Sequence, residues 1–410
     1  MSAPLSPPSA RTFFWPIALA AAAFLMITMG ARNSMGLFVS PINTSTGLGV
    51  VAISFAMAVG QFTWGAIQPI AGAFADKYGP GRVLATGIVS LALGMALTPY
   101  AKGEWALSFS IGLLMAAGAG AGSFSVLMGA ASQRLAPETR GMASGVINAG
   151  ASFGQFVFAP LAQRLISGLG WMGAMWSMAA ITLLALPLAR FLRGQPKPAL
   201  VANAPVEQTL SSAVKQSFKD RSYLLLHAGF FTCGFHIAFL ITHLPGEVQL
   251  CGLSPSVASW SLAIIGLANI AGSLLVGWSV AKVRSKMILF WMYFSRAVLI
   301  LLYLAAPKTE VTFYLFAFGL GATWLATVPP TAAIVGKLFG IRYLSTLFGL
   351  TLLSHQIGGF FGAWLGGIAL NAHGNFQWMW YADMALALAA AFVNLPIREA
   401  RIAKPAAQPA

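Results

Sequence analysis

Long apolar stretches recur along the whole chain, and they limit it to one broad class of fold. A helix needs roughly 20 apolar residues to cross the hydrocarbon core of a bilayer. In that core each backbone N–H and C=O must be bonded within the protein, which a helix achieves by itself. We therefore predict an all-α membrane protein of twelve transmembrane helices, at residues 13–40, 50–75, 83–101, 106–132, 142–166, 171–191, 223–247, 256–281, 287–306, 312–336, 345–370 and 376–396.

The charge content excludes a soluble protein of this length. Only 8% of the 410 residues are charged and 58% are hydrophobic, whereas roughly a quarter of an average soluble chain is charged. The net charge of +15 does not indicate nucleic-acid binding, because the basic residues follow the topology. With the N-terminus in the cytoplasm, 19 of the 24 Lys and Arg residues are cytoplasmic, and only Lys102, Arg164 and Lys308 are external. This asymmetry predicts a multi-pass protein of the cell (inner) membrane with both termini cytoplasmic.

One long polar stretch, residues 194–221, divides the chain in two. We interpret it as a cytoplasmic linker between two six-helix bundles, residues 13–193 and 222–398, with cytoplasmic tails at 1–12 and 399–410. The two halves echo each other, because Gly145 and Gly154 in span 5 have the same spacing as Gly349 and Gly358 in span 11. Internal repeats are typical of transporters that rock two bundles around a site at mid-membrane.

The loop between spans 2 and 3 carries the pattern GAFADKYGPGR at residues 72–82. Gly72 permits close helix approach, and Gly79 and Gly81 permit a tight turn. Asp76 ends span 2, where it can reach a helix N-terminus or a basic group. This pattern resembles the signature loop of the major facilitator superfamily. The resemblance implies a fold of two six-helix bundles and a cytoplasmic gate loop, with the gate residues Gly72, Asp76, Lys77, Gly79 and Arg82.

Four further segments indicate which branch of this superfamily the chain resembles. They are RNSMGLFVSPI in span 1, the Gln61 and Gln68-Pro69 pattern in span 2, GFHIAFLITHLP in span 7 and SHQIGGFFG in span 11. Together they resemble the bacterial branch of the monocarboxylate transporter family, which includes oxalate/formate antiporter-like proteins. The resemblance implies transport of a small organic anion such as lactate, pyruvate or oxalate, with protons or by exchange.

The chain departs from that family in its eighth span. Family members place an arginine there, with Asp or Asn one turn earlier, and these positions correspond here to Ser273 and Asn269. The asparagine is present and the arginine is absent. Either Arg32 supplies the carboxylate-binding charge from the other half, or the substrate is not a simple monocarboxylate.

Arg32 interrupts the apolar first span on the external side of its centre. Ionisable groups at membrane depth are costly and indicate a functional site by default. We expect Arg32 to bind a carboxylate through its planar fork of N–H groups. The alternative is that it bonds backbone carbonyls or polar side chains of the bundle. Asn33 and Ser34 follow it, and at most one of them can share its helix face.

Three pairs of polar residues are each seven residues apart, which places the members of a pair on one helix face. The pairs are Gln61 and Gln68, Asn148 and Gln155, and His236 and His243. We predict that these faces line one wet pathway, with hydrogen bonding between helices as the alternative reading. The candidate substrate-binding residues are therefore Arg32, Asn33, Gln61, Asn148, Gln155, His236, Asn269, Ser273 and His355.

Proton coupling requires a group that titrates near neutral pH, and histidine is the ordinary choice. The candidates are His236, His243 and the span-12 carboxylate Asp383, with neutral, merely hydrogen-bonded histidines as the alternative. For Arg296 in span 9, we favour either a structural ion pair with Asp383 or separate local hydrogen bonds. The sequence leaves proton symport, exchange and uniport open.

The predicted function is secondary active transport of a small organic anion by alternating access. The alternative is an exporter of amphipathic or aromatic compounds, including drugs, from the same superfamily. An enzyme is not expected, because the spans show no nucleophile–base set, no paired carboxylates and no metal cluster. We expect no cofactor, no metal site and no nucleic-acid partner. The expected partners are the anion, with a proton or counter-anion, and the lipid bilayer.

Overall fold

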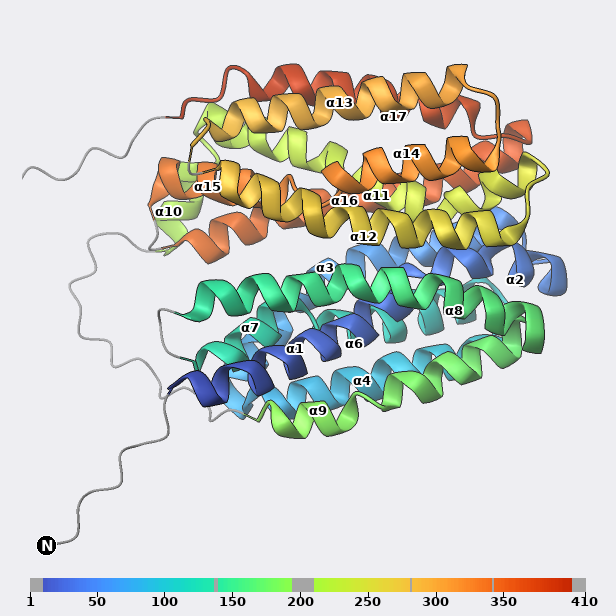
Figure 1. The fold of residues 1–410 in the computed structure, drawn as a ribbon, viewed down its shortest axis with the longest axis horizontal. Coiled ribbons are helices and arrows are strands. Elements are labelled where there is room, and N and C mark those ends of the chain that lie inside the picture. The colour runs from blue at the N-terminus through green and yellow to red at the C-terminus, as the bar shows by residue number, and fades with distance from the viewer. Residues whose placement is uncertain (1–9, 136–138, 194–209, 281, 341–342, 400–410) are drawn as a thin grey trace, which may run out of the picture.

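The computed structural model describes residues 10–135, 139–193, 210–280, 282–340 and 343–399, and every regular element in these ranges is a helix (Figure 1). The first half contains α1 (Ala10–Asn33), the 3-10 helix η1 (Met35–Phe38), α2 (Val39–Thr46), α3 (Val50–Tyr78), α4 (Pro80–Leu97), η2 (Thr98–Tyr100), α5 (Glu104–Leu107), the π-helix η3 (Ser108–Met115), α6 (Ala116–Ala121), α7 (Phe124–Ser132), α8 (Arg140–Leu183) and α9 (Leu186–Phe191). The second half contains α10 (Leu210–Ser217), α11 (Arg221–Leu250), α12 (Pro255–Ser279), α13 (Ser285–Ala305), α14 (Glu310–Thr323), α15 (Val328–Phe339), α16 (Leu344–His373) and α17 (Gln377–Asn394).

Each of the twelve predicted spans has a helical counterpart in the described ranges. Nine helical stretches there are long and apolar enough to cross a membrane. One of them, Met142–Phe191, contains both span 5 and span 6, which turn at Gly170, where φ is 70°. Glycine adopts this left-handed conformation without steric cost. Helices α16 and α17 fall outside the nine, because polar side chains such as His355, Gln356 and Asp383 interrupt their apolar sequences.

Three of the predicted spans are broken helices. Span 1 changes at Ser34 from α1 into η1, span 4 breaks between α6 and α7, and span 10 breaks between α14 and α15. The break in span 4 follows a glycine-rich turn of helix, and the break in span 10 precedes Pro329 and Pro330, whose nitrogens cannot donate a hydrogen bond. Paired interruptions in equivalent spans of two repeats are a pointer to the binding region of a transporter.

The two halves of the chain lie side by side (Figure 1). Helices α1, α4, α7, α8 and α9 gather on one side of the view, and α11 to α17 gather on the other. The halves meet mainly where α3 packs on α16 and where α8 packs on α12, with η1 and α2 against α11. Residues 194–209 of the predicted linker lie outside the described ranges, so the domain boundaries stay a prediction.

An equivalent close crossing occurs inside each half. Gly154 of α8 packs against the backbone of Met26 in α1, and Gly358 of α16 packs against the backbone of Phe231 in α11. A Cβ on either glycine would lie well under 3.0 Å from a carbonyl oxygen, a separation that real Cβ atoms essentially never show. Small residues allow such close helix association in lipid. The two glycines that have equivalent positions in the sequence therefore have equivalent places in the packing.

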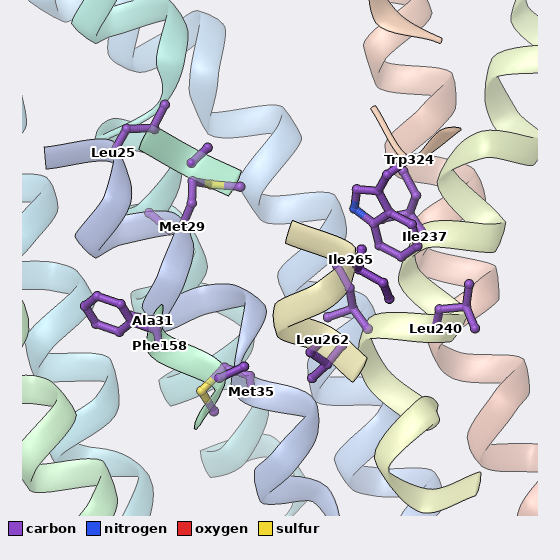
Figure 2. Packing of buried hydrophobic residues seen from close by; sticks show 14 of the residues in the cluster. Leu25, Met29, Ala31, Met35, Phe158, Ile237, Leu240, Leu262, Ile265 and Trp324 are labelled. Carbon is purple, nitrogen blue, oxygen red and sulfur yellow. The ribbon is translucent and has the colours of Figure 1, made fainter. Parts of the chain in front are cut away.

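Buried apolar side chains fill the space around the meeting of the two halves. Figure 2 shows this packing, with Leu25, Met29, Ala31, Met35 and Phe158 on the elements of the first half and Ile237, Leu240, Leu262, Ile265 and Trp324 on those of the second. Many large apolar side chains instead lie on the outside of the bundle, as a lipid-facing surface requires; those more than half exposed include Leu274, Leu275, Trp278, Trp291, Leu302, Leu315 and Phe318.

Candidate functional site

The break in the first span positions Arg32. Helix α1 ends at Asn33, and the chain continues through Ser34 into the tighter turn of η1. Ser34 Oγ donates back to the carbonyl of Gly30 at 2.8 Å, so this hydroxyl stays on its own helix. Asn33 instead turns toward Arg32, whose Nη1 donates to Asn33 Oδ1 at 3.1 Å. The prediction that at most one of these two neighbours joins Arg32 is confirmed.

The Arg32 guanidinium has only uncharged partners among the side chains that the structure describes. Its Nη2 donates to Gln61 Oε1 of α3, and its Cζ lies 4.4 Å from the centre of the Trp64 ring, a cation–π arrangement. Ion pairs between described side chains all involve other residues. The positive charge of Arg32 is therefore stabilised by two neutral amide oxygens, those of Asn33 and Gln61, and by the face of the Trp64 ring.

A small crevice opens beside Arg32 where the two halves meet. Its volume is about 30 Å³, enough for one or two water molecules. Arg32 and Gln61 are its polar side chains from the first half, and Thr242 of α11 comes from the second. The rest of the lining is apolar or glycine: Met35, Gly36, Met57, Gly60, Ile111, Met115, Ala116 and Ile241.

A chain of amides connects Arg32 to the second half. Asn33 Nδ2 donates to Gln155 Oε1 of α8 at 3.3 Å, and Gln155 Nε2 donates to the carbonyl of Leu262 in α12 at 2.9 Å. Gln155 is almost fully buried, so both of its polar ends need a partner. Two side chains therefore connect the guanidinium to the contact between α8 and α12.

Asn269 joins three helices close to this contact. Its Nδ2 donates to Ser152 Oγ of α8 at 2.7 Å, and its Oδ1 accepts from the backbone N–H of Leu325 at 2.9 Å and from Ser273 Oγ at 3.2 Å. Leu325 lies in the break between α14 and α15, so Asn269 satisfies a backbone group that the break leaves free. The two family positions in span 8 thus form a structural link between the halves.

The predicted polar stripes do not all face one pathway. Gln61 and Gln155 belong to the network around Arg32, whereas Gln68 and Asn148 make no hydrogen bond with a described residue. His236 and His243 lie inside the second half, 1% and 2% exposed. The histidine stripe therefore belongs to a different site from the glutamine stripes.

His236 and Asp383 form a buried pair. His236 Nδ1 lies 2.5 Å from Asp383 Oδ2, which joins α11 to α17. His243 lies near the carbonyl of Ala363, with its Nε2 at 2.7 Å, and no described carboxylate pairs with it. The His355 ring is tilted against that of Phe230, with ring centres 5.0 Å apart, and its Nδ1 lies 3.3 Å from Gln356 Nε2.

The ion pair between Arg296 and Asp383 that we considered from the sequence is absent, and separate local bonds take its place. Arg296 Nη2 donates to the carbonyls of Thr323 and Trp324, the second at 2.8 Å, and its Nη1 lies 3.4 Å from Cys233 Sγ. The carbonyls of Thr323 and Trp324 border the break in span 10, where they lack helical partners. Arg296 thus stabilises the broken helix.

The gate loop agrees with the prediction only in part. Gly79 has φ 89° and alone separates α3 from α4, which explains the need for glycine there. Gly81 lies within α4, where a Cβ would lie 2.6 Å from Arg193 Cγ and 3.0 Å from the carbonyl oxygen of Ala189 in α9. The glycine is therefore needed for the packing of α4 against α9 and not for the turn. The predicted close helix approach at Gly72 is wrong, because no described atom lies within 4 Å of its Cβ position.

The charged members of the loop are less informative. The Asp76 side chain lies outside the described part of the structure, Lys77 Nζ lies 5.1 Å from the Tyr78 ring, and Arg82 is exposed. The gate role of all these residues stays a prediction.

A charged cluster around Glu399, at the predicted cytoplasmic end, connects α13, α15 and the segment that follows α17. Glu399 accepts hydrogen bonds from the backbone N–H groups of Ser285 and Lys286, at the start of α13, and pairs with Lys337 of α15. Burial alone would raise the pKa of Glu399, but the hydrogen bonds from Lys337, Ser285 and Lys286 and the charge of Lys337 together lower it. Glu399 is therefore held as a carboxylate.

Sequence reasoning missed two partners of the arginines. Trp64 lies three residues after Gln61, on the same helix face, and that spacing was the available signal. Cys233 precedes His236 by three residues and contacts the broken helix at Thr327 Oγ1, 3.3 Å away. Nothing in the local sequence indicates that contact, which joins residues 94 positions apart.

Comparison with known proteins settles the family. The sequence model of the Major Facilitator Superfamily matches residues 20–254 and 248–410. The chain belongs to the major facilitator superfamily. It is therefore a multi-pass membrane transporter and not an enzyme.

Individual superfamily members agree with this conclusion at low identity. Monocarboxylate transporter 13 of Rattus norvegicus is 26% identical over 374 residues, which cover 88% of this chain and 83% of the relative. The uncharacterized MFS-type transporter YcxA of Bacillus subtilis (strain 168) is 22% identical over 405 residues, covering 95% and 97%. The crystal structure of a D-xylose–proton symporter has a TM-score of 0.68 at 15% identity and covers 94% of this chain and 98% of that one. The structural likeness supports the fold.

Proposed function

We propose that this chain carries a small, monocarboxylate-like organic anion across the cell (inner) membrane by alternating access, with both termini cytoplasmic. The observation that carries the proposal is Arg32, a guanidinium in a transmembrane helix that has only amide and aromatic partners among the described side chains. Its crevice lies where the two halves meet. The similarity of the chain to monocarboxylate transporter 13 of Rattus norvegicus, at 26% identity, supports the same substrate class.

The present partners of Arg32 are weaker than a carboxylate would be. Asn33 and Gln61 each offer one neutral amide oxygen, to Nη1 and Nη2 respectively. A carboxylate presents two charged oxygens that match these two nitrogens, and charge-assisted bonds are roughly twice as strong as neutral ones. Substrate can therefore replace the two amide oxygens at the same donor atoms.

Compensation of the Arg32 charge by a bound anion also explains how substrate binding can promote the change between states. A bare guanidinium at membrane depth is costly, and the halves can exchange states more readily once an anion compensates the charge. A ligand shifts a conformational equilibrium only through its differential affinity for the two states. The link from Asn33 through Gln155 to α12 is the route by which occupation of Arg32 would be felt between the halves.

The arrangement of the halves supports a state that is closed on the external side. Gly36 of η1 packs against the backbone of Ile241 in α11, near the predicted external end. At the predicted cytoplasmic ends of the four helices that join the halves, Cβ positions have no described atom within 4 Å at Gly72, Gly145, Gly277 and Gly349. We infer that this state, closed outside and open to the cytoplasm, alternates with a state that is open outside and closed to the cytoplasm.

An exporter of amphipathic or aromatic compounds is the alternative. The apolar lining of the crevice, with Met35, Met57 and Met115 beside a single cation, favours it. Methionine-rich surfaces adapt to varied ligands. Under this alternative Arg32 is dispensable for most substrates.

Uptake into proteoliposomes tests the proposal. The probes are labelled lactate, pyruvate and oxalate, with a neutral sugar and an organic cation as comparison, each with and without an imposed pH gradient. Arg32→Ala is the variant, and Arg164→Ala, an exposed arginine at the predicted external end, is its matched control. The proposal expects wild type and Arg164→Ala to move one or more of the anions, and Arg32→Ala to lose that uptake.

Two outcomes would overturn it. Movement of only the neutral or cationic probes would remove the anion proposal. Anion uptake that survives in Arg32→Ala would favour the exporter and show that the charge is not needed. Liposomes preloaded with a counter-anion separate proton symport from exchange, because a pH gradient drives the first and the counter-anion drives the second.

A further inference from the structure

The His236–Asp383 pair is the one contact between a basic side chain and a carboxylate, among the described side chains, that lies inside the spans. Both side chains are buried, His236 at 1% and Asp383 at 0% exposed. His236 Nδ1 and Asp383 Oδ2 are 2.5 Å apart, so one proton lies between them. Their other polar atoms, His236 Nε2 and Asp383 Oδ1, have no hydrogen-bond partner among the residues that the structure describes. Buried polar atoms without partners are rare and require an explanation.

The free ring nitrogen defines a second proton position. With a neutral imidazole, Nδ1–H donates to the carboxylate, Nε2 carries a lone pair, and the pair has a net charge of −1. A proton that binds at Nε2 forms an imidazolium and brings the net charge to zero, and no bond between heavy atoms changes. The pair can thus gain or lose one proton without losing its hydrogen bond.

Several ionisable groups lie on the helices that pack around this pair. On α11 these are Cys233 and His243, on α13 they are Tyr293 and Arg296, and on α16 it is His355. Arg296 contacts Cys233 Sγ, one turn before His236, and is the cation of the group.

Arg32 and the pair are separate sites. Arg32 bonds to α1 and α3, whereas the pair joins α11 to α17 in the other half. An anion at Arg32 therefore does not displace a proton at His236 by direct contact.

We propose that the His236–Asp383 pair is the binding site for the proton that is coupled to transport. The inference rests on the proposed anion transport and names its coupling ion. An anion at Arg32 adds one negative charge, and a proton at His236 adds one positive charge. The loaded carrier then has a compensated charge at both sites, whereas the empty one has an uncompensated cation at Arg32 and an uncompensated anion at the pair.

The break in span 10 supplies a route for access. Trp324, at 2% exposed, lies in this break, and its ring centre is 6.1 Å from that of His236. Arg296, Asn269 and Cys233 hold the same segment through polar contacts rather than through a continuous helix. Movement of this segment uncovers His236, which is closed to solvent in the present state.

Proton uptake on anion binding is the direct test. The purified full-length protein is titrated with whichever of lactate, pyruvate or oxalate wild type transports best, in two buffers with different ionisation enthalpies. The difference in heat gives the number of protons taken up per anion bound. The variants are His236→Gln and Asp383→Asn, which keep a hydrogen bond between the two positions. The matched control is His227→Gln on the same helix, since His227 contacts Ser354 and no acid.

The proposal expects about one proton per anion in wild type and in His227→Gln at the pH of maximal uptake, and about zero in both pair variants. Either pair variant suffices if the other is not monodisperse. Proton uptake that persists in His236→Gln or Asp383→Asn would overturn the inference. Anion binding by wild type without proton uptake would also overturn it and leave the proposed function intact. Absence of anion binding and transport would instead refute the proposed function.

Discussion

The contact between Gly36 and the backbone of Ile241, at the predicted external end, allows a quantitative prediction. A Cβ added at Gly36 would lie well under 3.0 Å from the carbonyl oxygen of Ile241, so Gly36→Ala forces η1 away from α11. Overpacking of this kind costs about 1–3 kcal/mol, which corresponds to a shift of roughly 5- to 150-fold between two states. Because the clash exists only when the external side is closed, the substitution should populate the externally open state.

Labelling of a buried thiol measures that shift. Thr242 is 3% exposed and lines the crevice beside Gly36. In Thr242→Cys protein that also carries Cys251→Ser, a membrane-impermeant maleimide added outside should react roughly 5- to 150-fold faster when Gly36→Ala is present. Gly129→Ala is the matched control, because no described atom lies within 4 Å of its Cβ position. An unchanged labelling rate in Gly36→Ala would refute the reasoning about closure.

Three further substitutions test individual contacts by thermal unfolding in detergent. Gly154→Ala should lower Tm by several degrees, because its Cβ meets the backbone of α1, whereas Gly145→Ala, which faces open space, should leave Tm unchanged. Arg296→Lys should lower Tm, because the planar guanidinium that donates hydrogen bonds to the Thr323 and Trp324 carbonyls and to Thr323 Oγ1 is replaced by a single ammonium group. An unaltered Tm would mean that the broken helix does not depend on these hydrogen bonds. Glu399 has a lowered pKa, so its stabilisation is present above the ordinary value of 4.5 and is lost as the pH falls through the lower folded value. The Tm difference between wild type and Glu399→Gln should therefore stay constant from pH 8 to pH 5 and shrink below about pH 4.5, and a difference that shrinks already near pH 7 would contradict this assignment.

The helices could be predicted from the sequence because apolar length alone determines what spans a bilayer. That at most one of Asn33 and Ser34 joins Arg32 could also be predicted, since consecutive residues on a helix point in different directions. The break in span 10 was signalled by Pro329 and Pro330, but its exact place was not, because backbone groups freed by a break are satisfied by distant side chains such as Arg296 and Asn269.

Contacts between distant helices were beyond sequence reasoning. His236 and Asp383 are 147 residues apart, and no periodicity relates span 7 to span 12. The equal spacing of His236 and His243 suggested one polar face, yet the first meets a carboxylate and the second a backbone carbonyl. Which partner a buried histidine finds depends on how α11 packs against α16 and α17, and a single sequence does not contain that arrangement.

Discrimination between an acid and its amide tests the central claim most directly. Arg32 offers Nη1 and Nη2 to a substrate carboxylate, and hydrogen bonds to charged groups contribute about 1.5–3 kcal/mol each. Two such bonds at the lower limit give about 3 kcal/mol, or roughly 100-fold. Wild-type protein in liposomes should therefore take up lactate at least about 100-fold more efficiently than lactamide, and Arg32→Gln should remove most of this preference. Equal preference in wild type and Arg32→Gln would contradict the assignment of Arg32 as the carboxylate site.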